Sequence, residues 1–315
     1  MALALIFPGQ GAQYVGMGME LASRFPEARR ILDEADAVLG FALSDLIANG
    51  PEDELTRTDL SQPAILTASW MAHAVLRASV SPCIFAATAG LSLGEYTALV
   101  AAEALDFADA LRLVRLRGQA MQRAAEAVPS GMVALIGADE ASATKLCQAA
   151  AGGEVLAVAN LNATGQVVIS GAKAACERAM ALAKEHGIRR AMALNVAGAF
   201  HSPLMLPAAA KLAEALRHVR FRTPRVPVYA NAIAAPVQDA ARIPELLVQQ
   251  LTAPVRWAES VQAMHAAGIT TCWELGPGKS LCGMISRTIA SMTLANLDTS
   301  ADALALAEAQ RRHGA

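Results

Sequence analysis

A serine at the centre of a G-x-S-x-G pattern stands where an apolar run meets a helix-forming run. Ser92 is the middle residue of the stretch 90–94, with the apolar run 84–89 before it and the helix-forming run 95–104 after it. A sharp strand-to-helix turn would hold the serine hydroxyl at its tip, in strained backbone for which the glycines leave room. The N–H groups at the start of the helix would face a developing oxyanion. The pattern predicts a nucleophile at Ser92.

A serine nucleophile needs a base, and His201 is the candidate. Of the six histidines, His201 alone lies in an expected loop at a predicted domain junction, where sites are favoured. The alternative is a surface or capping histidine. Ordinary hydrolases place an acid between the serine and the histidine, but no acid between 92 and 201 plainly follows a strand of the main domain. Either a neutral group elsewhere orients the base, or the hydrolase hypothesis is wrong.

Two further segments carry candidate chemistry. The glycine-containing loop 8–13 directly follows the first expected strand, so its N–H groups could serve an oxyanion, although a plain turn is the simpler interpretation. Arg117 precedes a glycine in the middle of an expected helix. An arginine in a pocket would pair a carboxylate through two hydrogen bonds. Spacing alone favours a solvated arginine.

The composition restricts the class of protein. The 315 residues suggest two domains or one domain with an insertion. No apolar run reaches the ~18 residues of a membrane-spanning helix, and the N-terminus resembles a first strand more than a signal peptide. The balance of 26 basic and 28 acidic residues gives no sign of nucleic-acid binding. Five scattered cysteines without C-x-x-C spacing argue against a metal site and favour a cytoplasmic location.

Short apolar runs alternate with longer amphipathic ones, which is typical of an α/β protein. Strands are expected at 3–7, 84–89, 132–136, 155–159, 166–170, 190–195, 227–230 and 270–275. Helices are expected near 16–38, 58–78, 95–104, 106–127, 140–151, 173–186, 203–219, 243–250 and 257–267. The β-α-β-β-α-β order in the middle predicts a ferredoxin-like subdomain at 128–196, with 160–165 as the loop between two strands. Residues 1–127 and 197–315 would form a hydrolase-like domain with a parallel sheet.

Taken together, these features resemble the malonyl-CoA:acyl-carrier-protein transacylase family along nearly the whole chain. The matching segments, in chain order, are 7–13, 61–64, 90–96, 117–122, 160–162, 198–202, Gln250 with 254–257, and 276–278. The fold of that family is a hydrolase-like domain with a ferredoxin-like insert, which agrees with the order of expected elements.

The resemblance implies a role for each matching residue. It implies that Ser92 takes the acyl group from coenzyme A and that His201 is first the general base and then the general acid. The backbone carbonyl of Gln250 would orient the histidine, which accounts for the missing acid. Further roles implied are an oxyanion hole from the N–H groups of Gln10 and Leu93, a malonate-binding Arg117, and substrate contacts from Met121, Phe200, Gln62 and Asn162.

The implied chemistry fits the residue types. A malonyl carboxylate is charged at pH 7, so its burial requires a paired cation, and an uncharged acetyl group would leave that cation unpaired. The acyl group would then pass to the phosphopantetheine thiol of an acyl carrier protein in a ping-pong cycle. Coenzyme A enters as the thioester substrate, and no bound cofactor, metal, nucleic acid or membrane is expected.

Two details concern the substrate and the pathway. The motif 199–201 and Leu93 are similar to the malonyl pattern of polyketide acyltransferases, not to the methylmalonyl one. Leu91 stands where the family commonly has a histidine, and a leucine there is similar to some discrete, trans-acting acyltransferases. The pathway therefore stays open between fatty-acid and polyketide synthesis. Candidates for a basic surface that docks the carrier, or simply for a solvated face, are Arg189, Arg190, Arg220, Arg222 and Arg225.

Two other functions compete with malonyl transfer. An acyl-thioester hydrolase of the same fold would clear wrong acyl groups from carriers, but it gains nothing from a carboxylate-binding Arg117. A non-catalytic carrier-binding subunit would have no use for an intact pair of Ser92 and His201.

Overall fold

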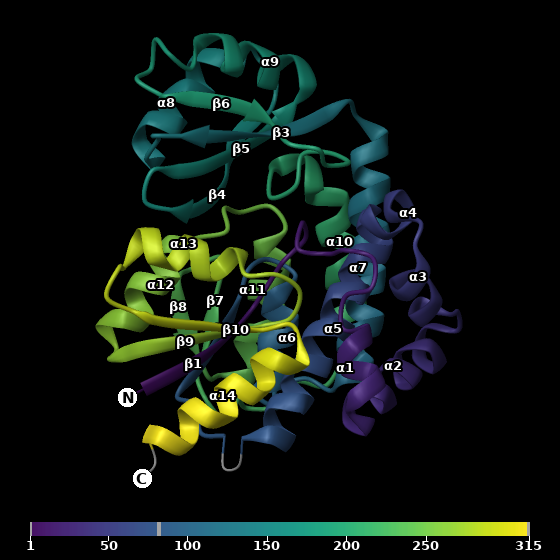
Figure 1. Cartoon of the computed structure of the whole chain (residues 1–315). Helices are drawn as coiled ribbons and strands as arrows, with labels where there is room; N and C mark the ends of the chain where they lie inside the picture. The colour runs from purple at the N-terminus through teal and green to yellow at the C-terminus, as the bar shows by residue number, and fades with distance from the viewer. Residues whose placement is uncertain (1, 81–82, 314–315) are drawn as a thin grey trace.

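A mostly parallel six-stranded sheet forms the centre of the larger unit in the computed structural model, which describes residues 2–80 and 83–313 (Figure 1). The strand order is β10-β9-β1-β2-β7-β8; the first five strands run parallel and β8 pairs antiparallel with β7. The hydrolase-like parallel sheet predicted from the sequence is confirmed. The strands are β1 (Ala2–Phe7), β2 (Ala87–Gly90), β7 (Val228–Ala230), β8 (Ala235–Val237), β9 (Ile269–Leu275) and β10 (Thr293–Leu297).

Helices cover this sheet, and the longest of them are buried against one another. Helix α5 packs against α2 and α7 and is buried along most of its length. Within the described residues no helix combines the length and the apolar character needed to cross a membrane. The helices of this unit are α1 (Met19–Arg24), α2 (Pro26–Leu39), α3 (Leu43–Asn49), α4 (Glu52–Thr56), α5 (Thr58–Ser79), α6 (Gly94–Ala101), α7 (Phe107–Ala127), α10 (Leu206–Leu216), α11 (Ile243–Gln250), α12 (Trp257–Ala266), α13 (Ser280–Thr288) and α14 (Ser300–His313), with 3₁₀ turns at Pro203–Met205 and Ala240–Arg242.

A second, antiparallel sheet of order β4-β5-β3-β6 lies above the first in Figure 1. Its strands alternate with α8 and α9 in the predicted β-α-β-β-α-β order, and a separate apolar cluster lies between the sheet and these helices. The ferredoxin-like arrangement is therefore confirmed, while the boundaries at 128 and 196 stay a prediction. The elements are β3 (Ser130–Ile136), α8 (Glu140–Ala150), β4 (Leu156–Ala163), β5 (Gln166–Ala172), α9 (Lys173–Leu182) and β6 (Arg190–Ala193).

Two expectations from the sequence were wrong in ways that physics explains. The helix expected over 16–38 is two helices, because Pro26 forces the preceding Phe25 into extended backbone (φ −122°, ψ 116°). The loop expected over 160–165 is strand up to Ala163, and only a short turn that contains Gly165 (φ +72°) joins β4 to β5. Additional hydrogen bonds to Val255 hold this end of β4 in place, although asparagines disfavour strands.

Other boundaries moved by a few residues or were not foreseen. The strand before Ser92 begins only at Ala87, and the helix expected from 203 begins as a 3₁₀ turn. Six elements had no counterpart among those expected from the sequence: α3, α4, β8, α13, β10 and α14.

Candidate active site

The turn between β2 and α6 holds Ser92 in the left-handed region, at φ +52°. A Cβ atom on Gly90 would collide with the backbone of Gly94, and a Cβ atom on Gly94 would collide with the carbonyl oxygen of Phe7. Glycine is therefore required at both positions, since the helix begins directly against the end of β1. The strained turn expected from the G-x-S-x-G pattern is present, with the serine at its tip.

The hydroxyl of Ser92 lies 2.8 Å from Nε2 of His201, although the two residues are 109 positions apart. The other ring nitrogen, Nδ1, lies 2.7 Å from the backbone carbonyl oxygen of Gln250. A carbonyl only accepts, so Nδ1 carries the hydrogen and Nε2 of the neutral ring accepts from the serine. The geometry is that of a serine, a base and a neutral orienting group.

Burial keeps His201 neutral. Desolvation, together with the positive charge of Arg117, lowers the pKa of His201 to about 4, against the opposing effect of its bond to Gln250. The imidazole is therefore able to accept a proton at neutral pH.

Arg117 on α7 is only 1% exposed. Its Nη1 donates to Oε1 of Gln62 (2.7 Å), and its Nη2 donates to the Ser92 hydroxyl (3.0 Å) and to Oε1 of Gln250 (2.9 Å). Its Nε has no partner in the part of the chain that the structure describes. The solvated arginine favoured by spacing alone is wrong, whereas the pocket arginine implied by the family resemblance matches this position.

The close approach of two helices brings Arg117 inward. A Cβ atom on the next residue, Gly118, would collide with the carbonyl oxygen of Thr58 at the start of α5. The glycine therefore lets α7 press against α5, which also supplies Gln62. Gln62 does not line the cavity described below: it is fully buried behind Arg117. Its expected substrate contact is therefore replaced by a contact to the arginine.

Two residues beneath the serine were not singled out from the sequence. Asn231 accepts from the Ser92 N–H through Oδ1 (2.6 Å) and donates to the carbonyl oxygen of Gly90 through Nδ2 (2.8 Å), which braces the strained turn. It follows the parallel strand β7, at the carboxyl edge of the sheet where such sites occur. That position was the signal that could have identified it.

Glu95 is the second such residue, and it lies buried under Gln250. Its Oε2 accepts from the backbone N–H of Asn231 (3.0 Å) and from Nε2 of Gln250 (2.8 Å). Gln250 Nε2 also lies 2.9 Å from the carbonyl oxygen of Ser92. Burial raises the pKa of Glu95 to about 7, although its hydrogen bonds and the charge of Arg117 act in the opposite direction.

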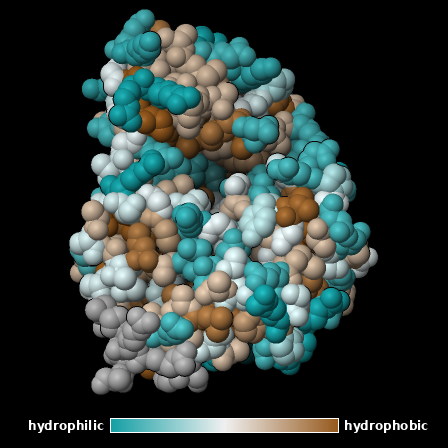
Figure 2. All heavy atoms as spheres, in the orientation of Figure 1, coloured by the Kyte–Doolittle hydropathy of each residue, from teal (hydrophilic) through white to brown (hydrophobic). Residues whose placement is uncertain are grey.

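A cavity of about 210 Å³ opens above the serine, and Figure 2 shows the surface hollowed between the two sheets. Residues of both units line it, so the site lies in the cleft where it was expected. The polar lining includes Gln10, Ser92, Arg117, Asn160, Asn162 and His201. The apolar lining includes Leu91, Leu93, Met121, Met132, Val168, Val196, Phe200 and Met284.

The two N–H groups implied as an oxyanion hole are available. Those of Gln10 and Leu93 make no hydrogen bond within the described residues, whereas that of Ser92 itself is taken by Asn231. Both Gln10 and Leu93 line the cavity. Asn162 reaches it from β4, with its Oδ1 buried and unpartnered in the described part of the chain.

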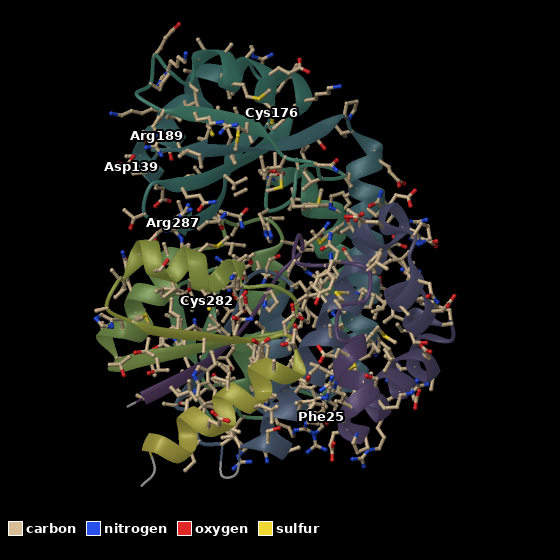
Figure 3. The ribbon with its side chains drawn as sticks, viewed as in Figure 1. Phe25, Asp139, Cys176, Arg189, Cys282 and Arg287 are labelled. Atoms are coloured by element: carbon tan, nitrogen blue, oxygen red, sulfur yellow. The ribbon has the colours of Figure 1, made fainter. Side chains whose placement is uncertain are left out.

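Helix α13 of the lower unit reaches the upper one beside this cleft. Arg287, labelled in Figure 3, lies 3.4 Å through Nη1 from Oε1 of Gln166 on the small sheet. The buried Glu274 fixes the start of α13, because its carboxylate accepts from the N–H groups of Leu281 (3.1 Å) and Cys282 (2.8 Å).

The arginines proposed for carrier docking separate into two groups. Arg222 pairs with Asp106 (2.7 Å) and Arg225 with Glu103 (2.5 Å), so their charges are locally balanced. Arg189 and Arg190 are exposed on the small unit, where Figure 3 labels Arg189. Arg220 is exposed as well. Arg189, Arg190 and Arg220 therefore stay candidates for carrier docking.

Known proteins are similar to this chain in sequence and in fold along most of its length. A model of the acyl transferase domain matches residues 4–313. The malonyl CoA-acyl carrier protein transacylase of Salmonella typhimurium is 44% identical over 94% of this chain and 95% of its own length. The enzyme of that name from Escherichia coli strain K12 is 45% identical over the same shares, and the human mitochondrial one is 38% identical over 88% of this chain and 74% of its own.

Solved structures agree. The malonyl CoA-acyl carrier protein transacylase of Coxiella burnetii superimposes with a TM-score of 0.95 at 38% identity, over 98% of this chain and 97% of its own. A malonyl-transacylase solved in complex with a type II polyketide synthase acyl-carrier protein superimposes with a TM-score of 0.94 at 40% identity, over 98% of this chain and 100% of its own.

The fold, the domain match and the serine site define an acyltransferase. More narrowly, the chain belongs to the malonyl-CoA:acyl-carrier-protein transacylase family.

Proposed function

We propose that this protein transfers a malonyl group from malonyl-CoA to the phosphopantetheine thiol of an acyl carrier protein. The observation that carries the proposal is the buried Arg117, whose Nη2 lies 3.0 Å from the Ser92 hydroxyl. A cation at this place binds an acyl group that carries its own negative charge. The relatives named for malonyl transfer support the same substrate.

In the first half-reaction, Ser92 attacks the thioester carbonyl while Nε2 of His201 takes the hydroxyl proton. The tetrahedral intermediate places its oxyanion at the N–H groups of Gln10 and Leu93. Its collapse breaks the carbon–sulfur bond, and His201 returns the proton to the leaving thiolate of coenzyme A. Gln250 keeps the ring oriented through its backbone carbonyl (2.7 Å). The product is a malonyl ester on Ser92.

In the second half-reaction, the carrier thiol enters the same cleft. His201 takes the thiol proton, the thiolate attacks the malonyl ester, and the proton passes to the departing Ser92 oxygen. Malonate's free carboxylate stays on Arg117 through both steps, while Met121, Phe200 and Asn162 shape the space around it. The relative solved with its carrier protein supports this partner, and roles in fatty-acid and polyketide synthesis both fit.

The architecture assigns a part to each unit. We propose that 1–127 and 197–315 carry the nucleophile, base and arginine, and that 128–196 form the opposite wall of the substrate cleft. Coenzyme A is a substrate here, and the residues named above supply the chemistry without a bound cofactor. The free cysteines support a cytoplasmic location.

The experiment that tests the proposal separates transfer from hydrolysis. Malonyl-CoA and a phosphopantetheinylated carrier are mixed with the enzyme, and malonyl-carrier, free coenzyme A and free malonate are all quantified. We expect one malonyl-carrier per coenzyme A released, and neither product with a Ser92→Ala variant. Release of malonate in place of malonyl-carrier would favour the hydrolase, which gains nothing from Arg117.

A further inference from the structure

The charge of Arg117 is balanced inside the protein in an indirect way. The three groups that accept from its guanidinium, the oxygens of Gln62, Ser92 and Gln250, are all neutral. Within the described residues it makes no salt bridge. The negative charge that offsets it comes from Glu95, which is buried (3% exposed).

Gln250 connects the two charges. Its Oε1 accepts from Arg117 (2.9 Å), and its Nε2 donates to the Glu95 carboxylate (2.8 Å). A single amide therefore separates a buried cation from a buried anion, and the same residue holds His201 through its carbonyl oxygen. An amide dipole with a cation at its oxygen and an anion at its nitrogen is favourable at both ends.

We propose that Glu95 limits the affinity for the malonyl group, as the internal counter-charge with which the malonyl carboxylate competes for Arg117. This inference rests on the proposed function. In the free enzyme, Glu95 and Arg117 form a neutral buried set. Arrival of the malonyl carboxylate adds a second negative charge to one guanidinium. Glu95 therefore weakens malonyl binding while its hydrogen bonds position Gln250, and it touches neither the substrate nor the reacting atoms.

Two substitutions separate the charge of Glu95 from its hydrogen bonds. In Glu95→Gln one amide oxygen still accepts from Asn231 and Gln250, but the negative charge is gone. In Glu95→Ala both the charge and the acceptor are lost. A residue with only a structural role would slow all substrates equally in both variants.

The readout is acyl-enzyme formation in the absence of carrier, followed by rapid mixing over a range of malonyl-CoA and of acetyl-CoA concentrations. At about pH 8, where the wild-type carboxylate with its pKa of about 7 is ionised, Glu95→Gln is expected to lower the half-saturating malonyl-CoA concentration about tenfold. Acetyl-CoA, which brings no carboxylate, should be unaffected. Glu95→Ala should slow both acylations, because Gln250 loses its anchor.

An unchanged or lower ratio of malonyl to acetyl acylation in Glu95→Gln would overturn the inference. Such a result with acyl-enzyme still forming leaves the proposed function intact, whereas absence of any adduct on Ser92 in the wild type removes the proposed function itself. The two failures are thereby distinguishable.

A second measurement leaves Glu95 unchanged, so it tests the inference even if the Glu95 variants do not fold. Ser92→Ala enzyme is titrated calorimetrically with malonyl-CoA and with acetyl-CoA in two buffers of different protonation enthalpy. The groups that face Glu95 are Arg117 and Tyr96. Burial raises the pKa of the tyrosine, which therefore stays protonated, and the guanidinium stays protonated although burial lowers its pKa. We expect fractional proton uptake with malonyl-CoA only; equal uptake with both thioesters would contradict a competing counter-charge.

Discussion

His201 Nδ1 donates its hydrogen to the backbone carbonyl oxygen of Gln250, 2.7 Å away, and not to a carboxylate. A main-chain acceptor cannot be removed by substitution. The Gln250 side chain meanwhile makes separate bonds to Arg117 and Glu95. One residue thus serves the base and the substrate-binding arginine through different atoms.

This division predicts unequal effects of two substitutions. In Gln250→Ala the base keeps its orientation, so we expect acylation to slow by about 10- to 100-fold, from the lost positioning of Arg117. In His201→Ala the loss should reach about 10³- to 10⁴-fold. Rapid-mixing measurements of acyl-enzyme formation check both. Equal losses in the two variants would mean that the side chain of Gln250, and not its carbonyl, orients the base.

The pH dependence of acylation should reflect the depressed pKa of His201. The base works only when neutral, and burial together with Arg117 lowers its pKa from 6.5 to about 4. Acylation of the free enzyme should therefore hold between pH 6.5 and about 5 and fall only near pH 4. The free energy of unfolding changes in the same direction. The contribution of His201 is fully present above pH 6.5, the pKa of a histidine in the unfolded chain, and is lost as pH falls from 6.5 towards 4, because the unfolded chain then binds a proton that the folded one excludes.

The profile is measured as the rate of acylation against pH, with a stability curve taken in parallel. Denaturation within the same pH range is thereby separated from titration of the base. A fall in acylation centred near pH 6.5 while the protein is still folded would show that the pKa of His201 is not lowered.

Arg117→Ala should abolish the preference for malonyl-CoA. A buried charge-assisted contact is lost, and we expect the ratio of malonyl to acetyl acylation to fall by about 100-fold or more. Arg115 provides the matched control on the same helix, because it pairs with Asp59 (2.8 Å) outside the cleft. If Arg115→Ala changes the ratio as much as Arg117→Ala does, the selectivity does not come from a guanidinium in the cavity.

Gly94→Ala tests how the serine turn is built. The new Cβ atom would collide with the carbonyl oxygen of Phe7, so we expect about 3 kcal/mol or more of destabilisation together with loss of acylation. Gly283→Ala is the control, since nothing lies within 4 Å of its Cβ position in α13. That change should stabilise the protein by about 0.5–1 kcal/mol. Chemical denaturation measures both, and a tolerated Gly94→Ala would show that β1 does not abut the turn.

The sequence predicted most of the fold because its local signals agree with the tertiary structure. Strand β1 and helices α5 and α7 fall within one or two residues of their expected bounds. The strand pair 155–159 and 166–170 was predicted, but the continuation of the first strand to Ala163 was missed because its asparagines disfavour strands. The compensating hydrogen bonds come from Val255, about ninety residues away. A local sequence pattern does not reveal partners that lie so far apart in the chain.

The candidate site shows the same limit. Ser92 stood out through its flanking glycines, and His201 through its loop. The burial of Arg117 depends on which face of α7 meets α5, which the spacing of Arg112, Arg115 and Arg117 along the helix does not decide. Asn231 reaches the serine turn from the end of a strand about 140 residues further along the chain, and Glu95 lies next to the G-x-S-x-G pattern but acts through Asn231 and Gln250. Their roles depend on these long-range contacts, which the sequence alone does not reveal.

The most direct test of the account is the mass of the intact protein after brief mixing with malonyl-CoA in the absence of carrier. We predict an increase by one malonyl group in the wild type, no increase in Ser92→Ala, and little increase with acetyl-CoA. A malonyl adduct that persists in Ser92→Ala, or a wild type that turns over malonyl-CoA without any adduct, would contradict a malonyl-enzyme on Ser92.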